Sequence, residues 1–363
     1  FSSELIKKAE EKRKIGGNMG IIGRHSFELC SRPRIISSAS YVGDKEGKGP
    51  LRECFDKICR DDTLGLDSWE QAESRMFESA VRVALAKIKR QSDDLSCLLG
   101  GDLLNQIISS GFAAREIRAP FIGLYGACST ISEGLMLGGM LVDGGFAELA
   151  ACAASSHFSA AERQFRYPLE MGVQAVPSSQ RTVTGAGSII IQAAGEFRPG
   201  AGNVFEHVAL TGGTIGSVED FGITDANNMG AAMAPAAFKT IKTHLSDYSR
   251  RVEDYDRIIT GDLGIFGSDM LYELLRGEGI EIADRHEDCG KLMFSPEQNV
   301  NCGASGCGCA ATIMSSWFLP KIESGEIRRV LFLATGALMS PVSSLQGESI
   351  PSIAHAVVIE HID

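Results

Sequence analysis

Cys128 is the residue of this sequence whose surroundings best suit nucleophilic chemistry. It lies in PFIGLYGACSTISEGLMLGGMLVDGG (120–145), where an apolar strand-like run ends at Gly126-Ala127 and a nearly uncharged helix-like run follows. A cysteine at such a turn is close to free backbone N–H groups, and the helix dipole favours the thiolate over the thiol. The segment indicates a nucleophile or an anion-binding turn, although a small buried residue at a tight turn has the same pattern.

A second glycine-rich segment, CGASGCGCAA from Cys302, has a similar character. Ser305 and Cys307 open its helix-like part, so a second helix N-terminus is expected there. The spacing of its cysteines around glycines is not that of a zinc knuckle, and we expect neither a metal nor a cofactor. Ten cysteines in mostly apolar surroundings are typical of reduced thiols rather than of a disulfide framework.

Both segments belong to a sequence that repeats itself. DLSCLLGGDL from Asp94 matches DYDRIITGDL from Asp254, and GGFAELAACAAS from Gly144 matches SGEIRRVLFLATG from Ser324. Each match is a turn followed by a short buried strand, so we expect a duplicated α/β protein. The predicted halves are residues 33–200 and 201–363, after an N-terminal arm of residues 1–32. Asp102 and Asp262 follow equivalent strands, where they either cap helices or touch a ligand.

Composition excludes several classes of function. Lys and Arg number 35 against 46 Asp and Glu, a net charge of −11, which is the wrong sign for a nucleic-acid-binding protein. The longest nearly uncharged apolar stretch, 330–342, is far short of the roughly 20 residues that a membrane-spanning helix needs. The opening FSSELIKKAEEKRKIGG is charged rather than a secretory leader. The sequence therefore predicts a cytosolic protein with no transmembrane segment.

Several longer runs give the sequence a family resemblance. They are GGDLLNQ (100–106), GACST (126–130), SSH (155–157) with AERQFRYP (161–168), GITD (222–225), MGAAMAPAA (229–237), TGDL (260–263) and IPSIAHAVVIE (350–360). With these runs the sequence resembles the stage V sporulation protein AD family of spore-forming bacteria, within the thiolase superfamily. The resemblance implies a duplicated thiolase-like fold, five-layered α/β/α/β/α, with two mixed, mostly parallel sheets.

The resemblance also bears on catalysis. Thiolases and ketoacyl synthases use a cysteine at the turn occupied here by Cys128, together with a His, or a His and an Asn, from the second half. In this sequence Asp262 stands where the His is expected and Ala304 where the Asn is expected. Neither His157 nor His355 lies in a matching motif. The resemblance therefore favours a binding cleft over an enzyme, while an acyltransferase with Cys128 as the acyl-accepting nucleophile stays open.

The resemblance further implies a ligand and a set of partners. The family is associated with uptake of dipicolinic acid, a planar pyridine dicarboxylate, into the developing spore. We expect this compound, or its neutral calcium chelate, to bind between the two helix N-termini. The expected ligand-binding residues are Asp102, Cys128, Ser129, His157, Arg163, Asp262, Ser305 and Cys307. His157, Arg163 and Arg166 lie on a loop, 155–180, placed to cover the cleft, although Arg163 and Arg166 follow Glu162 and equally fit a surface ion-pair network.

The implied partners are other proteins of the same sporulation operon, including components of a membrane channel. This would place the chain on the cytoplasmic side, peripheral to the spore inner membrane. Whether it forms a homodimer is left open.

Overall fold

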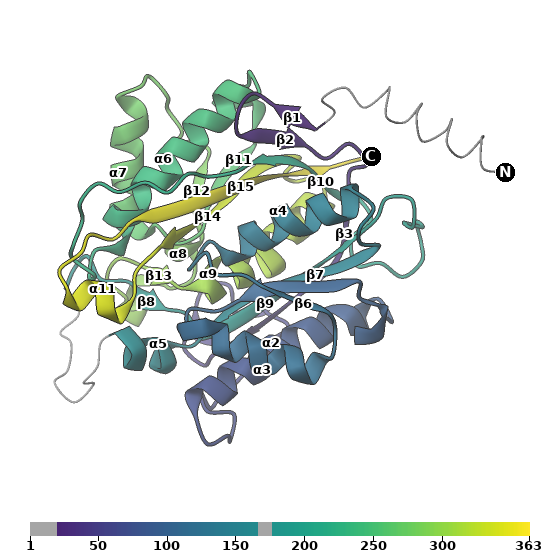
Figure 1. The fold of residues 1–363 in the computed structure, drawn as a ribbon, viewed down its shortest axis with the longest axis horizontal. Coiled ribbons are helices and arrows are strands. Elements are labelled where there is room, and N and C mark those ends of the chain that lie inside the picture. Colours follow the sequence, from purple (N-terminus) through teal and green to yellow (C-terminus); the bar gives the residue numbers. More distant parts are fainter. Residues whose placement is uncertain (1–19, 166–175) are drawn as a thin grey trace.

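Two groups of five strands with the same order and direction form the centre of the protein (Figure 1). The computed structural model describes residues 20–165 and 176–363. In the first group the order is β6 (Phe121–Gly123), β5 (Cys97–Gly101), β7 (Leu149–Ser156), β9 (Gly185–Gln192) and β3 (Arg34–Val42). In the second it is β12 (His286–Asp288), β11 (Arg257–Thr260), β14 (Arg329–Ala337), β15 (Ser352–His361) and β10 (Val208–Thr214).

Strand directions repeat as well. In the first group β5 is parallel to β6 and β7, whereas β9 is antiparallel to both β7 and β3. In the second group β11 is parallel to β12 and β14, whereas β15 is antiparallel to both β14 and β10. The two groups, called the first and second sheet below, are joined into one continuous hydrogen-bonded sheet, because β10 pairs with β3 through Ala209 and Arg34. The strand order thus carries the repeat that the two Gly-Asp segments indicated in the sequence.

Helices form the other three layers. The helices α4 (Thr130–Asp143) and α9 (Cys307–Ile313) lie between the sheets, and α4 contacts strands of both. Outside the first sheet lie α2 (Trp69–Lys87) and α3 (Ile108–Ile117), and outside the second lie α6 (Met229–Asp247) and α7 (Gly264–Arg276) (Figure 1). Three hydrophobic clusters fill the spaces between these layers. The predicted five-layered α/β fold with mixed sheets is confirmed.

Shorter elements complete the described chain. They are β1 (Ile21–Ile22), β2 (Ser26–Glu28), β4 (Lys57–Ile58), α5 (Phe158–Phe165), β8 (Arg181–Thr182), α8 (Cys289–Leu292), β13 (Ala304–Ser305), a π-helical turn (Met314–Phe318), α10 (Leu319–Glu323) and α11 (Pro341–Leu345). The described part of the predicted N-terminal arm adds to the second sheet, because β2 pairs with β10. The rest of the arm, 1–19, lies outside the described residues. No helix in the described ranges is long and apolar enough to cross a bilayer.

Small residues let α4 approach the sheets closely. Its face toward β7 carries Gly134 and Gly138, and a Cβ at Gly138 would lie 2.9 Å from the Cys152 sulfur. Leu135 and Ile131 on the same helix are fully buried. Because this packing is tight, the N-terminal end of α4 is held firmly against the ends of the strands. The turn that carries Cys128 therefore sits on a rigid support.

Candidate functional site

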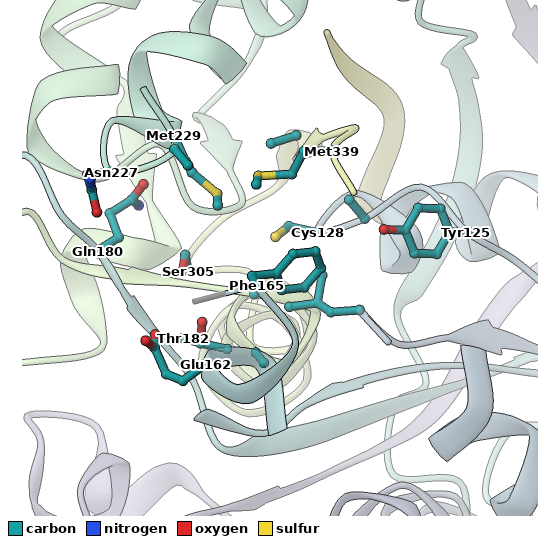
Figure 2. Close-up of a pocket in the computed structure, with 16 residues that line it drawn as sticks. Tyr125, Cys128, Glu162, Phe165, Gln180, Thr182, Asn227, Met229, Ser305 and Met339 are labelled. Carbon is teal, nitrogen blue, oxygen red and sulfur yellow. The ribbon is translucent and has the colours of Figure 1, made fainter. Parts of the chain in front are cut away.

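A pocket opens beside Cys128, between the strand ends of the two halves (Figure 2). The space free of protein atoms in the pocket and its open mouth together is about 630 Å³. Part of its wall is apolar or sulfur-bearing and includes Tyr125, Phe165, Met229 and Met339. Another part is polar and includes Glu162, Gln180, Thr182, Asn227 and Ser305. Such a pocket suits a small, flat ligand with a polar edge.

The turn that presents Cys128 is strained. Ala127 has a φ of 48°, in the left-handed region that residues with a Cβ rarely adopt. The Ser129 hydroxyl donates to the Gly126 carbonyl at 2.6 Å, and the Cys307 thiol donates to the Ala127 carbonyl at 2.9 Å. These bonds from both halves hold the turn in place. Strain held by its surroundings is common at functional sites, and here it places Cys128 in the pocket wall.

Burial and Asp262 together determine the state of the Cys128 sulfur. The Cys128 thiol is buried, and the charge of the Asp262 carboxylate acts on it. Burial, and next the charge of Asp262, raise the pKa of the Cys128 thiol well above its usual value. Desolvation and a like charge therefore outweigh the effect of the helix dipole, which favours a thiolate. Cys128 is held as a thiol.

Asp262 itself is fully buried and well supplied with donors. Its carboxylate accepts hydrogen bonds from the Gly306 N–H at 2.9 Å and from the Thr335 hydroxyl at 3.0 Å. Burial raises the pKa of Asp262 to about 7, and the neighbouring Asp288 contributes in the same direction. Asp262 thus binds the start of α9 in the second half, and its charge acts on the Cys128 thiol of the first half.

The N–H groups at the two predicted helix N-termini largely have partners within the protein. The Gly306 N–H binds Asp262 and the Gly308 N–H binds the Ser156 hydroxyl at 3.0 Å. At the start of α4 the N–H groups of Ser129 and Thr130 bind the carbonyls of Gly126 and Ala127. We expected a ligand carboxylate to bind at these helix N-termini. These four N–H groups bind acceptors within the protein instead. Ser305 and Cys128 line the pocket, whereas Ser129 and Cys307 are buried behind it.

Three of the other expected residues lie away from the pocket lining. The Asp102 carboxylate accepts from the N–H groups of Leu104 and Ser110, which is the capping alternative. The His157 imidazole contacts the Asp62 carbonyl at 2.8 Å, and burial lowers its pKa. Arg163 forms an ion pair with Glu70 on α2 and lies over the Trp69 ring. Each of these side chains has a protein partner and lies outside the described pocket lining. A ligand-binding role for these three residues stays a prediction.

Two further residues complete the comparison. Arg166, predicted on the covering loop, lies outside the described residues. His355 accepts a hydrogen bond from the Gly216 N–H at 3.2 Å, and burial lowers its pKa to about 4. In the described ranges no three His, Cys, Asp or Glu side chains come together in a way that could hold a metal ion.

Much of the polar wall was missed by sequence reasoning. Gln180, Thr182 and Asn227 lie in stretches with no clear hydrophobic period, so pattern analysis does not single them out. Two runs of the family resemblance, 161–168 and 229–237, do contain pocket residues: Glu162, Phe165 and Met229. The long runs that carry the family resemblance therefore pointed to these pocket residues, whereas reasoning from single residue types did not.

The raised pKa of Asp262 predicts a pH-dependent contribution to stability. The ordinary pKa of the group is 3.8 and the folded value is about 7, so the folded protein binds the proton more tightly between these values. The stability from Asp262 is therefore present below about pH 4 and lost as the pH rises to about 7. Asp262→Asn does not titrate. Urea denaturation should show the difference in unfolding free energy, wild type minus Asp262→Asn, falling by about 2 kcal/mol from pH 5 to pH 8; a constant or rising difference would contradict the assignment.

Known proteins resemble this chain in sequence and in fold. Residues 23–360 match the family model described as stage V sporulation protein AD. The stage V sporulation protein AD of Bacillus subtilis (strain 168) is 43% identical over 343 residues, which is 94% of this chain and 98% of that protein.

Solved structures add a likeness in fold. OleA from Xanthomonas campestris covers 90% of this chain at 14% identity, with 96% of its own chain matched and a TM-score of 0.57. The 3-oxoacyl-[acyl-carrier-protein] synthase III of Aquifex aeolicus VF5 covers 91% at 11% identity, with 100% of its own chain matched and a TM-score of 0.55. Human mitochondrial 3-ketoacyl-CoA thiolase covers 93% at 11% identity, with 100% matched and a TM-score of 0.56. At these identities the likeness shows a thiolase-like fold.

Proposed function

From the premise that this chain belongs to the stage V sporulation protein AD family, we propose that its pocket at Cys128 binds dipicolinic acid or the calcium chelate of that acid. Binding would assist uptake of the compound into the developing spore. The chain is a sporulation protein with a thiolase-like fold. The ligand, the uptake role and the partners are the proposal.

The burial of the Cys128 thiol under the influence of the Asp262 carboxylate carries the proposal. A nucleophilic cysteine needs its proton removed, and a neighbouring base or positive charge normally helps. Here the neighbour is a buried carboxylate, which holds the proton on sulfur. Of the described residues that line the pocket, none is a histidine, lysine or arginine. A pocket of this kind favours holding a ligand over activating a thiol.

The walls suit a planar heteroaromatic ring. Tyr125 and Phe165 offer ring surfaces, and the thioethers of Met229 and Met339 adapt to flat apolar ligands (Figure 2). Thr182, Ser305 and Asn227 can donate hydrogen bonds to carboxyl oxygens. The described lining offers no cation, and the whole chain has a net charge of −11. These charges favour an uncharged form of the ligand, such as the calcium chelate or a protonated acid, over the free dianion.

An acyltransferase is the second candidate. The strained Ala127 before Cys128 favours it, because that backbone places the sulfur at the pocket wall as a nucleophile would require. Several structures of similar fold are of enzymes, including a 3-oxoacyl-[acyl-carrier-protein] synthase III and a 3-ketoacyl-CoA thiolase. This candidate requires Cys128 to lose its proton to Asp262. The transfer is unfavourable, because the pKa of the thiol is raised well above its usual value whereas the pKa of Asp262 is about 7.

The partners and location proposed for the chain follow from the same family. We propose that it works at the cytoplasmic side of the spore inner membrane with membrane proteins of its own operon. A homodimer is compatible with this role. Co-purification from sporulating cells with and without detergent would test the association.

Two measurements separate the candidates. Calorimetric titration with dipicolinic acid, with and without equimolar calcium, is expected to show saturable binding. Incubation with acyl-CoA followed by intact-mass and peptide mass spectrometry is expected to show no acyl adduct on Cys128. An adduct that turns over, without dipicolinate binding, would make the enzyme the better description.

A further inference from the structure

Gln180 is fixed in one orientation by two carbonyl groups of the second half. Its Nε2 donates to the Asp262 carbonyl at 2.7 Å and to the Ala304 carbonyl at 2.9 Å. A primary amide has two N–H donors, and both are used here. Turning the amide over would set Oε1 against two carbonyl oxygens, so the assignment of nitrogen and oxygen is determined by the partners.

The other end of this amide has no partner. Oε1 of Gln180 is buried and has no hydrogen-bond partner in the described part of the chain. The side chain is 8% exposed and belongs to the pocket wall, beside Asn227 and Met229 (Figure 2). A buried acceptor is normally paired, so this oxygen needs a donor that the described protein does not supply.

The neighbouring groups do not meet this need. The Gly306 N–H is used by Asp262. Hydroxyl groups such as those of Thr182 and Ser305 can either donate or accept, so they adapt to a ligand. Oε1 of Gln180 can only accept, and two carbonyl groups fix its orientation. It therefore distinguishes a ligand carrying a donor from one without.

We propose that Gln180 is a specificity residue that requires a hydrogen-bond donor, an N–H or O–H, on the ligand. This inference rests on the proposed function and deepens it. A fully deprotonated carboxylate has only acceptors, and it would face Oε1 with two like partial charges. Dipicolinic acid would then bind with a proton on a carboxyl group or on the ring nitrogen, and the calcium chelate would present a calcium-bound water.

A matched pair of uncharged ligands tests the donor requirement. Pyridine-2,6-dicarboxamide and 2,6-diacetylpyridine have the same planar shape and the same carbonyl groups, but only the first carries N–H donors. Calorimetry with the wild-type protein is expected to give a dissociation constant at least tenfold lower for the dicarboxamide. Equal affinities, tighter binding of the diketone, or no binding of the dicarboxamide would overturn the proposal.

The preference should depend on Gln180. Gln180→Met has a similar length and volume but no acceptor, so its dicarboxamide preference is expected to fall to within about threefold of parity. Gln346→Met, at an exposed glutamine outside the pocket lining, should keep the wild-type preference. Thermal melting checks that each variant is folded. If Gln180→Met does not fold, the wild-type comparison of the two ligands still decides the matter.

Dipicolinic acid is titrated in parallel, in two buffers of different ionisation enthalpy. A heat that depends on the buffer reveals proton uptake on binding, which the proposal predicts for the free acid. Dipicolinate binding without discrimination between the two neutral ligands would remove the role of Gln180 and leave the proposed function standing. Discrimination between the two neutral ligands without any binding of dipicolinate or its chelate would support the role of Gln180 and contradict the proposed function.

Discussion

Cys128→Leu is expected to abolish dipicolinic acid binding, whereas Cys128→Ala keeps most of it. Cys128 is part of the pocket wall on a turn held from both halves, so the backbone cannot move away from a larger side chain. Added volume in a tight site costs about 1–3 kcal/mol or more, which corresponds to a loss of up to roughly 100-fold in affinity. Alanine removes only the contacts of the sulfur, about 1 kcal/mol or less, and leaves Asp262 two of its donors.

Calorimetry on both variants, with circular dichroism as a check on folding, measures this difference. Cys30 is exposed, so Cys30→Leu serves as the matched control and should bind as the wild type does. An enzyme would behave differently, because alanine and leucine are equally inactive in place of a nucleophile. If Cys128→Ala loses all binding while Cys128→Leu retains it, the ligand does not sit against Cys128.

Asp262→Asn is expected to make Cys128 at least tenfold more reactive toward iodoacetamide at pH 8. In the wild-type protein burial and the Asp262 carboxylate together hold the thiol proton. The amide removes the charge and can donate an N–H to the sulfur, so the thiolate becomes more accessible. Since the thiolate is the reactive species, alkylation should accelerate.

Peptide mass spectrometry over a time course assigns the alkylation to Cys128. Cys302 is close to Asp288 rather than in contact with Asp262, so its rate provides an internal reference that should change little. The double variant Asp262→Asn, Cys128→Ala should lose the accelerated site. An unchanged rate at Cys128 would mean that burial alone, without Asp262, keeps the cysteine protonated.

The fold was predicted well because the repeat consists of short, local sequence patterns. Each Gly-Asp step follows a buried strand, and the structure places those strands, β5 and β11, at equivalent positions of the two sheets. The turn at Cys128 was recognisable for the same reason, since a strand-like run, small residues and a helix-like run follow one another. Patterns of this kind depend on neighbours in the chain.

The chemistry of the site was less predictable because it depends on contacts between the halves. The burial of the Cys128 thiol, together with the charge of a carboxylate from the second half, outweighs the effect of the helix. Arg163 was expected at the cleft, but its ion-pair partner Glu70 lies 93 residues earlier in the chain. Gln180 gained its role only through two carbonyls of the second half. No rule based on sequence spacing predicts contacts between residues so far apart in the chain.

The location of the ligand is the central claim, and a crystal structure of the protein with dipicolinic acid tests it most directly. We expect electron density for the ligand ring in the pocket between Tyr125 and Met229, in contact with Cys128 and with a donor atom facing Oε1 of Gln180. Density elsewhere, for instance beside Arg163 on the outer face of α5 with the Cys128 pocket empty, would contradict it.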